Sequence, residues 1–143
     1  MMIIGDIENE IIGKIREKIP ELHVEGFPDQ PSEFRLTHPK GAILVYYLGA
    51  NYSQSKNLGY IVQDKTLEFS ITIITRDLRS CWGVYHYIDF IRNLLTGYKP
   101  ENCSKMQPVK EHFISENTGI WQYEINFTLT TPNIEGRRDM LLI

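Results

Sequence analysis

The sequence has few of the features that mark secreted or membrane-spanning proteins. Its 143 residues include only two cysteines, Cys81 and Cys103, which are too few for a disulfide framework. No apolar run approaches the ~20 residues that cross a bilayer, and the opening residues lack the basic and apolar regions of a secretory signal. We therefore expect a reduced, cytoplasmic protein that has no membrane partner.

Neither sign of charge dominates the composition. The formal net charge is -3 at pH 7 and the pI is near 5.8, whereas a duplex-binding protein normally carries a basic stripe. The apolar fraction of 42% and the charged fraction of 23% are typical of a globular protein. We expect one domain over residues 1–143, with a core large enough to need no disulfide, and no direct sequence-specific binding of nucleic acid.

Known catalytic and metal-binding motifs are also absent. The sequence contains no glycine-rich phosphate loop, nucleophile elbow, H-E-x-x-H helix or paired C-x-x-C. The densest polar group is Cys81, His86 and Asp89, but Cys81 and His86 would lie about 140° apart on a helix. His86 and Asp89 can meet at the i, i+3 spacing, on the solvent face of that helix. We predict no catalytic residue, no metal and no cofactor.

Two amphipathic helices are predicted. The first runs from Ile7 to Ile19, with Asp6 as its N-terminal cap and Pro20 as its stop. The second runs from Trp82 to Thr96 and is closed by Gly97. The apolar arc of the second helix is wide, which predicts contacts with the first helix or with another subunit in addition to the sheet.

Four segments have the patterns of β-strands. Residues 22–24 form a short candidate, and residues 41–48 are apolar on both faces, as in a central strand. Residues 67–73 and 121–130 alternate strictly between apolar and polar side chains, so that one face of the sheet would be buried and the other in water. The order of helix, strands, helix and strands predicts an α+β fold, a two-layer sandwich with a mainly antiparallel sheet.

Three long polar connections separate these elements, at residues 27–40, 49–58 and 130–138. Most loops in compact domains have about four to six residues, and long loops on a rigid scaffold are usual sites of contact. The chain also ends in four apolar residues, 140–143, which would dock either on the core of the same chain or on a neighbour. These features favour assembly with other protein subunits.

Short motifs around the second helix occur in a distinctive order. They are Arg76–Arg79 (R-D-L-R), Gly83–Tyr85 (G-V-Y), Ile88–Arg92 (I-D-F-I-R) and Leu95–Gly97 (L-T-G). This order resembles the central signature of the Mu-like phage tail-terminator family. The isoleucine-rich first helix and the strands at residues 39–46 and 121–127 also fall in the order of that family, so the resemblance extends over residues 4–131.

The resemblance implies a fold with two helices on one face of a mainly antiparallel sheet. It implies a hexameric ring at the head-proximal end of a contractile tail, which caps tube and sheath, stops polymerisation and joins the neck. The partners would be other copies of this chain, the tube and sheath proteins and a neck or connector protein, first in the cytoplasm of the bacterial host and then in the virion. The family transfers no catalytic residue and no contact residue to this sequence.

Exposure arguments alone place the subunit contacts in the second and third long connections. We predict contacts with a neighbouring subunit or the tube for eight residues: Asn51, Tyr52, Gln54, Lys56, Asn133, Glu135, Arg137 and Arg138.

Other functions stay open at this point. A neck or tail-completion ring protein would show the same features as a tail terminator. A small single-strand nucleic-acid-binding module would need arginines on the polar face of the sheet. A hydrolase would need His86 and Asp89 in a cleft.

Overall fold

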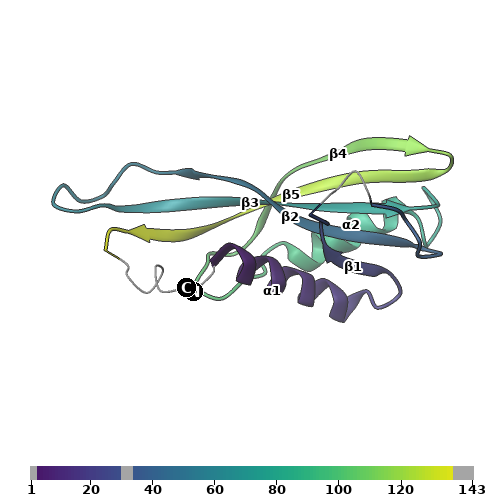
Figure 1. The fold of residues 1–143 in the computed structure, drawn as a ribbon, viewed down its shortest axis with the longest axis horizontal. Coiled ribbons are helices and arrows are strands. Elements are labelled where there is room, and N and C mark those ends of the chain that lie inside the picture. The colour runs from purple at the N-terminus through teal and green to yellow at the C-terminus, as the bar shows by residue number, and fades with distance from the viewer. Residues whose placement is uncertain (1–2, 30–33, 137–143) are drawn as a thin grey trace.

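The computed structural model describes residues 3–29 and 34–136, which form two helices and five strands. In chain order the elements are α1 (Ile3–Lys18), β1 (His23–Gly26), β2 (Gly41–Tyr52), β3 (Val62–Thr75), α2 (Val84–Leu95), β4 (Gln107–Asn117) and β5 (Ile120–Ile134). Figure 1 shows both helices on one side of a long, twisted sheet. The predicted α+β class and its two-layer arrangement are confirmed.

The sheet is mixed, with the strand order β1-β2-β3-β5-β4. Edge strand β1 pairs with β2 in parallel, and all other neighbouring strands in this sheet are antiparallel. The central pair of β3 and β5 stays in register without a bulge, from Val62 opposite Ile134 to Thr75 opposite Trp121. The two strands with strict alternation are therefore the two that form the longest continuous ladder.

The core lies between the sheet and the two helices. Leu67, Phe69 and Phe127 are fully buried on the face of β3 and β5 that the helices cover. Helix α1 and the turn after it contribute the isoleucines at positions 7, 11, 12, 15 and 19, and α2 contributes Val84, Tyr87, Ile88, Ile91 and Leu95. Each fully buried side chain of this size contributes about 1.5–3 kcal/mol relative to an exposed one, so this layer holds the helices on the sheet.

The helix boundaries differ from the predicted ones at their starts. Helix α1 already includes Ile3, so Asp6 lies inside its first turns and is not the N-terminal cap. The carboxylate is still close to the positive end of the helix dipole. Helix α2 begins at Val84, two residues after the predicted start, because the chain before it forms a tight turn. Gly97 follows α2 with a φ of 85°, as a helix-ending glycine does.

Two of the predicted loops are partly strand. Strand β2 continues to Tyr52 and β5 to Ile134, so residues 49–52 and 130–134 are paired. A bulge at Leu48 shifts the register of β2, after which Gly49 pairs with Glu68. Small and polar residues can continue the strand here because the ladder uses backbone hydrogen bonds only.

Edge strand β4 has no alternating pattern that would predict it. Its pairing with β5 shifts register twice, between Pro108 and Lys110 and again between Phe113 and Ser115. Each shift interrupts the two-residue period. Bulges, proline and lysine on an edge strand also oppose edge-to-edge aggregation.

Candidate assembly surface

One end of the sheet extends beyond both helices. Figure 1 shows the ends of β2, β3 and β5 projecting as a narrow extension that no helix covers. We call this extension the arm and define it as residues 51–65 and 132–136. Asn51 pairs with Thr66 at its base and Val62 pairs with Ile134 near its tip. The arm therefore joins the two connections in which subunit contacts were predicted.

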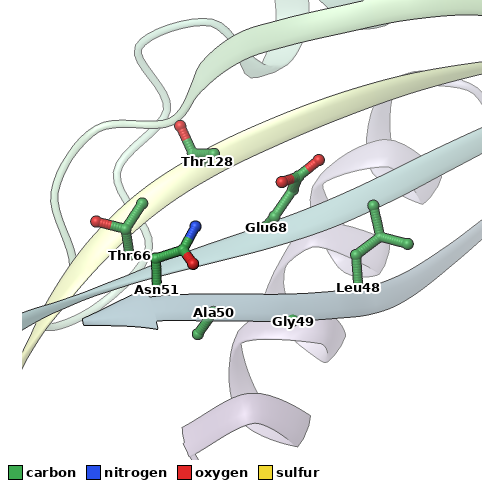
Figure 2. A pocket seen from close by; sticks show the side chains of 7 residues that line it. All are labelled: Leu48, Gly49, Ala50, Asn51, Thr66, Glu68 and Thr128. Atoms are coloured by element: carbon green, nitrogen blue, oxygen red, sulfur yellow. The ribbon is translucent and has the colours of Figure 1, made fainter.

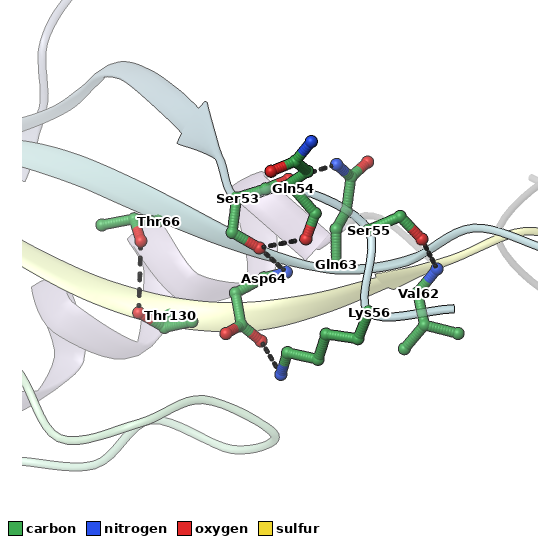
Figure 3. A network of polar contacts seen from close by, with 9 residues as sticks. All are labelled: Ser53, Gln54, Ser55, Lys56, Val62, Gln63, Asp64, Thr66 and Thr130. Atoms are coloured by element: carbon green, nitrogen blue, oxygen red, sulfur yellow. Dashed lines mark hydrogen bonds and ion pairs between the residues drawn. The ribbon is translucent and has the colours of Figure 1, made fainter. Parts of the chain in front are cut away.

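Hydrogen bonds within the arm give its turn a defined shape (Figure 3). Ser53 and Asp64 exchange two bonds of 2.8 Å, from the Ser53 amide to the Asp64 carbonyl and from the Asp64 amide to the Ser53 hydroxyl. Lys56 donates its amide to the Val62 carbonyl at 2.6 Å and its ammonium to the Asp64 carboxylate at 3.2 Å. The amide of Val62 binds the Ser55 hydroxyl at 3.0 Å. Most polar groups of this turn are thus satisfied within the arm.

Several large apolar side chains of the arm are exposed, although the Lys65 ammonium lies 5.7 Å from the centre of the Tyr52 ring. Leu58 is fully exposed, and about half of the surface of Tyr52 and Tyr60 is exposed, at 55% and 51%. Ile61 is exposed at 42%. Large apolar side chains gathered on an ordered projection are typical of a surface that is covered by another protein.

Six of the eight predicted contact residues lie on the arm. These are Asn51 and Tyr52 at the end of β2, Gln54 and Lys56 in the turn, Asn133 near the end of β5 and Glu135 just after it. Asn133 donates an amide hydrogen bond of 2.8 Å to Gln63, and the Glu135 carboxylate accepts the Ile61 amide at 3.1 Å. Arg137 and Arg138 lie outside the described residues. Contact of these eight residues with another subunit stays a prediction.

The sheet face opposite the helices is polar, but its side chains are less exposed to solvent than the alternating pattern predicts. Ser70, Thr72 and Asn126 lie on this face and are at least nine-tenths buried. Tyr46 covers part of it, and the ring of Phe27 packs edge-on against Tyr46 at 4.8 Å. The expectation of a fully solvated second face is therefore wrong, because Phe27, just after β1, packs on Tyr46 over part of the sheet.

Two carboxylates lie on this polar face. The Glu68 carboxylate accepts a hydrogen bond of 3.0 Å from the Asn126 amide. The Glu124 carboxylate accepts a long hydrogen bond of 3.4 Å from the Tyr46 hydroxyl and lies 3.8 Å from His112. Burial, followed by the charge of Glu124, raises the pKa of Tyr46 above its usual value. The two carboxylates share this face with His112 and with Lys110, which lies opposite Asn126 in the ladder.

Glu68 also lines a shallow depression of about 200 Å³ near the base of the arm. Its walls come from residues 48–51 of β2, Thr66 and Glu68 of β3 and Thr128 of β5. Figure 2 shows the Glu68 carboxylate between Leu48 and Thr128, on the side of the sheet away from α1. The bulge at Leu48 places an apolar side chain beside this carboxylate, so the depression combines one apolar wall with hydroxyl, amide and carboxylate groups.

Sequence comparison places the chain in a family. The model of the Gp37 protein family matches residues 11–141. The chain belongs to the Gp37 family. No curated protein matches this Gp37-family sequence. Among solved structures, a chain from the virion of a native gene transfer agent particle has a TM-score of 0.59 at 11% sequence identity, with 90% of this chain and 96% of that chain covered. At that identity the match shows a shared fold.

The motifs that resemble the tail-terminator signature have structural roles in this Gp37-family chain. The first amides of α2 are satisfied by the preceding turn, because Val84 and Tyr85 donate to the carbonyls of Asp77 and Leu78, each at 3.1 Å. Gly83 allows this close approach. The guanidinium of Arg79 lies 5.8 Å from the centre of the Tyr85 ring. The R-D-L-R and G-V-Y motifs therefore build the start of the helix.

The residues considered for catalysis do not form a site. His86 and Asp89 are exposed on the outer face of α2, and Asp89 is ion-paired with Arg92, which also binds Glu111. Within residues 3–29 and 34–136, no cluster of three or more His, Cys, Asp or Glu side chains could hold a metal ion. In the same residues no helix has both the length and the apolar character to span a bilayer.

The two thiols are expected to differ sharply in reactivity. Cys81 is exposed, whereas Cys103 is buried, and burial together with the nearby Glu10 carboxylate raises the pKa of the Cys103 thiol. Because the thiolate is the reactive form, a thiol reagent at neutral pH should modify only Cys81 in the native protein and both cysteines in denaturant. Mass spectrometry of the labelled peptides measures this, and rapid labelling of native Cys103 would contradict the packing described.

Proposed function

We propose that this Gp37-family chain is a structural subunit of a phage-like particle, and that it forms a ring at the head-proximal end of the tail. The observation that carries the proposal is the fold match to a chain of a gene transfer agent virion, which covers nearly the full length of both chains. In this role the chain would cap the tube and the sheath, stop their growth and join the neck. It would act in the host cytoplasm during assembly and then in the particle.

The arm supports this proposal because a ring needs a heterologous contact, in which one patch of a subunit meets a different patch of the next. An ordered projection with exposed Leu58, Tyr60 and Ile61 can reach beyond the body of its own subunit. The tail-terminator signature around α2 further supports the cap over other positions in the particle. The proposed partners are other copies of the chain in a hexameric ring, the tube and sheath proteins and a neck protein.

The same features also fit a neck or tail-completion ring, and only the position in the particle separates the two roles. The nucleic-acid-binding alternative has less support. It would need arginines on the polar sheet face, but that face carries the carboxylates of Glu68 and Glu124. Carboxylates at the centre of a surface repel the phosphate backbone, which supplies most of the affinity of such proteins.

Electron microscopy of polymerised tail tubes from the same particle, mixed with the purified chain, tests the proposal. Ring-shaped density at one end only, together with blocked tube growth, is the expected result. Bare tube ends at saturating protein would contradict the cap and move the assignment to the neck. Tubes are needed because a cap can assemble only on its tube, in which case a free monomer in solution is uninformative.

Polar substitutions at the tip of the arm are expected to weaken capping by at least about tenfold. The variant combines Leu58→Asp with Tyr60→Ser, which removes exposed apolar surface and places a charge where a partner would bury it. Both side chains are exposed, so the free energy of unfolding should change by less than about 1 kcal/mol. The fraction of capped tubes at a series of protein concentrations measures the effect.

The matched control is Phe90→Ser, which alters an exposed aromatic side chain on α2, away from the arm. It should leave capping close to that of the natural chain. Unchanged capping by the arm variant would remove the arm from the contact surface, whatever the control shows.

A further inference from the structure

We propose that the depression around Glu68 receives the tandem arginines Arg137 and Arg138 of a second copy of this chain. The inference rests on the proposed ring, because it names a contact by which one subunit would recognise the next. It assigns the acceptor to the polar sheet face of one copy and the donor to the segment that follows the arm of its neighbour.

The depression has the chemistry of an arginine site. Glu68 offers a carboxylate that one guanidinium can bind through two parallel hydrogen bonds. The buried amide of Asn126 holds this carboxylate at 3.0 Å and so fixes its orientation before binding. Thr66, Thr128 and Asn51 line the same depression with oxygen atoms that accept further N–H groups, and Leu48 provides an apolar wall for the arginine stem.

Within the part of the chain that the structure describes, the Glu68 carboxylate forms no ion pair. A half-buried carboxylate that lines a depression without a counter-charge is complementary to a basic side chain from outside. Lys110 lies on the same face, opposite Asn126, but it forms no ion pair with Glu68. A basic group on a partner can therefore supply the counter-charge.

Every arginine within the described residues is already engaged in its own fold. Their partners are the Val24 carbonyl for Arg16, the Phe34 carbonyl for Arg35, the Leu36 and His38 carbonyls for Arg76, the Tyr85 ring for Arg79, and Asp89 and Glu111 for Arg92. The sequence has two further arginines, Arg137 and Arg138. Their adjacent charges lie immediately after the arm in the sequence.

The chain length favours a contact between copies over one within a subunit. Thr128 lines the depression, and the amide of Glu135, just after β5, binds the Ile61 carbonyl at 2.9 Å. The two residues are seven positions apart, or about 23 Å in an extended chain. From Glu135 the chain can return by at most about 11 Å before Arg138. A gap of about 12 Å between the backbones then remains, even with the chain fully extended on its return. A contact within one subunit would need the arginine and Glu68 side chains both to be stretched toward each other, whereas a neighbouring copy has no such restriction.

A peptide-binding experiment tests the contact without any tail tube. The receptor is the isotope-labelled full-length chain carrying R137E and R138E, which removes competition from its own arginines. The ligand is a synthetic peptide of residues 133–140. We expect NMR shift changes centred on Asn51, Glu68 and Thr128, and a dissociation constant that rises by about tenfold or more when Glu68→Gln is added to the receptor.

Two comparisons make the result specific. Glu17→Gln, an exposed carboxylate on α1, should leave the affinity unchanged. A receptor with Glu68→Arg should no longer bind the natural peptide. It should instead bind a peptide in which both arginines are replaced by glutamate, because the charges of the two partners are then exchanged. The Glu68→Gln receptor should stay folded because its carbonyl can still accept the Asn126 amide, and its NMR spectrum checks this.

The outcomes separate this contact from the proposed ring. Absence of shifts at the depression, or equal affinity for the Glu68→Gln receptor, would overturn the contact even if tubes are capped normally. Failure of the natural chain to cap tubes, with peptide binding intact, would instead overturn the tail-end function and leave the contact as a self-association site. Loss of capping by Glu68→Gln without any peptide binding would mean that another protein occupies the depression, which also overturns the proposal.

Discussion

Replacing Gly83 with alanine is expected to lower the free energy of unfolding by about 3 kcal/mol, at the upper end of the usual cost of overpacking. A Cβ atom at this position would lie 2.5 Å from the carbonyl oxygen of Leu78, 2.6 Å from its carbonyl carbon and 2.9 Å from the amide nitrogen of Arg79. These are backbone atoms, and the same turn satisfies the first amides of α2. The turn cannot move away without breaking these hydrogen bonds, so urea denaturation should show a large loss.

The matched control is Gly13→Ala, the same substitution in the exposed interior of α1. No atom lies within 4 Å of an added Cβ there, and alanine favours a helix over glycine by about 0.5–1 kcal/mol. This variant should therefore be more stable than the natural chain. If Gly83→Ala lowers the free energy of unfolding by less than about 1 kcal/mol, the close approach of the backbone is not the reason for glycine in the G-V-Y motif.

The parts of the fold that could be predicted are those in which one segment carries the whole signal. Strict alternation predicted β3 and β5, and helical spacing predicted α1 and α2, because each pattern reflects one face of one element against the core. The parallel pairing of β1 with β2 and the strand β4 have no such local signal. The first depends on how the chain crosses the sheet, and two bulges interrupt the period of the second.

Only part of the candidate surface could be predicted from the sequence. Asn51, Tyr52 and Asn133 were chosen as residues of polar loops, but the structure places them on strands that pair to form the arm. Their proximity follows from the register of β2, β3 and β5, which spans segments far apart in the chain. The Glu68 depression could not be predicted, since it depends on the bulge at Leu48 and on the partner of Glu68 across the sheet.

The family motifs and the proposed contact surfaces carry different information about function. The motifs from Arg76 to Gly97 build the start, the buried face and the end of α2. They therefore indicate a local fold that is shared by proteins with the same motifs. The arm and the polar face are where this chain would recognise its neighbours, and neither contains one of these motifs. A family signature therefore supports the type of particle, whereas specific contacts must come from the residues on these surfaces.

Replacing Phe127 with alanine is the substitution expected to cost the most stability, about 3–5 kcal/mol. Phe127 is fully buried in the middle of β5 and pairs with Phe69, which is also fully buried, so the lost ring leaves a cavity beneath both helices. The whole stability of a domain of this size is about 5–15 kcal/mol. The variant should consequently unfold at a much lower urea concentration, or be partly unfolded at 37 °C, as circular dichroism would show.

Phe113→Ala provides the comparison, because it removes the same ring from edge strand β4, where the side chain is 50% exposed. Its loss should stay below about 1.5 kcal/mol, mainly from the ring contacts with Tyr123 and Trp121. Equal losses for the two variants would contradict a single core between sheet and helices. A large loss for Phe127→Ala alone would show that the body of the domain is stabilised by this layer.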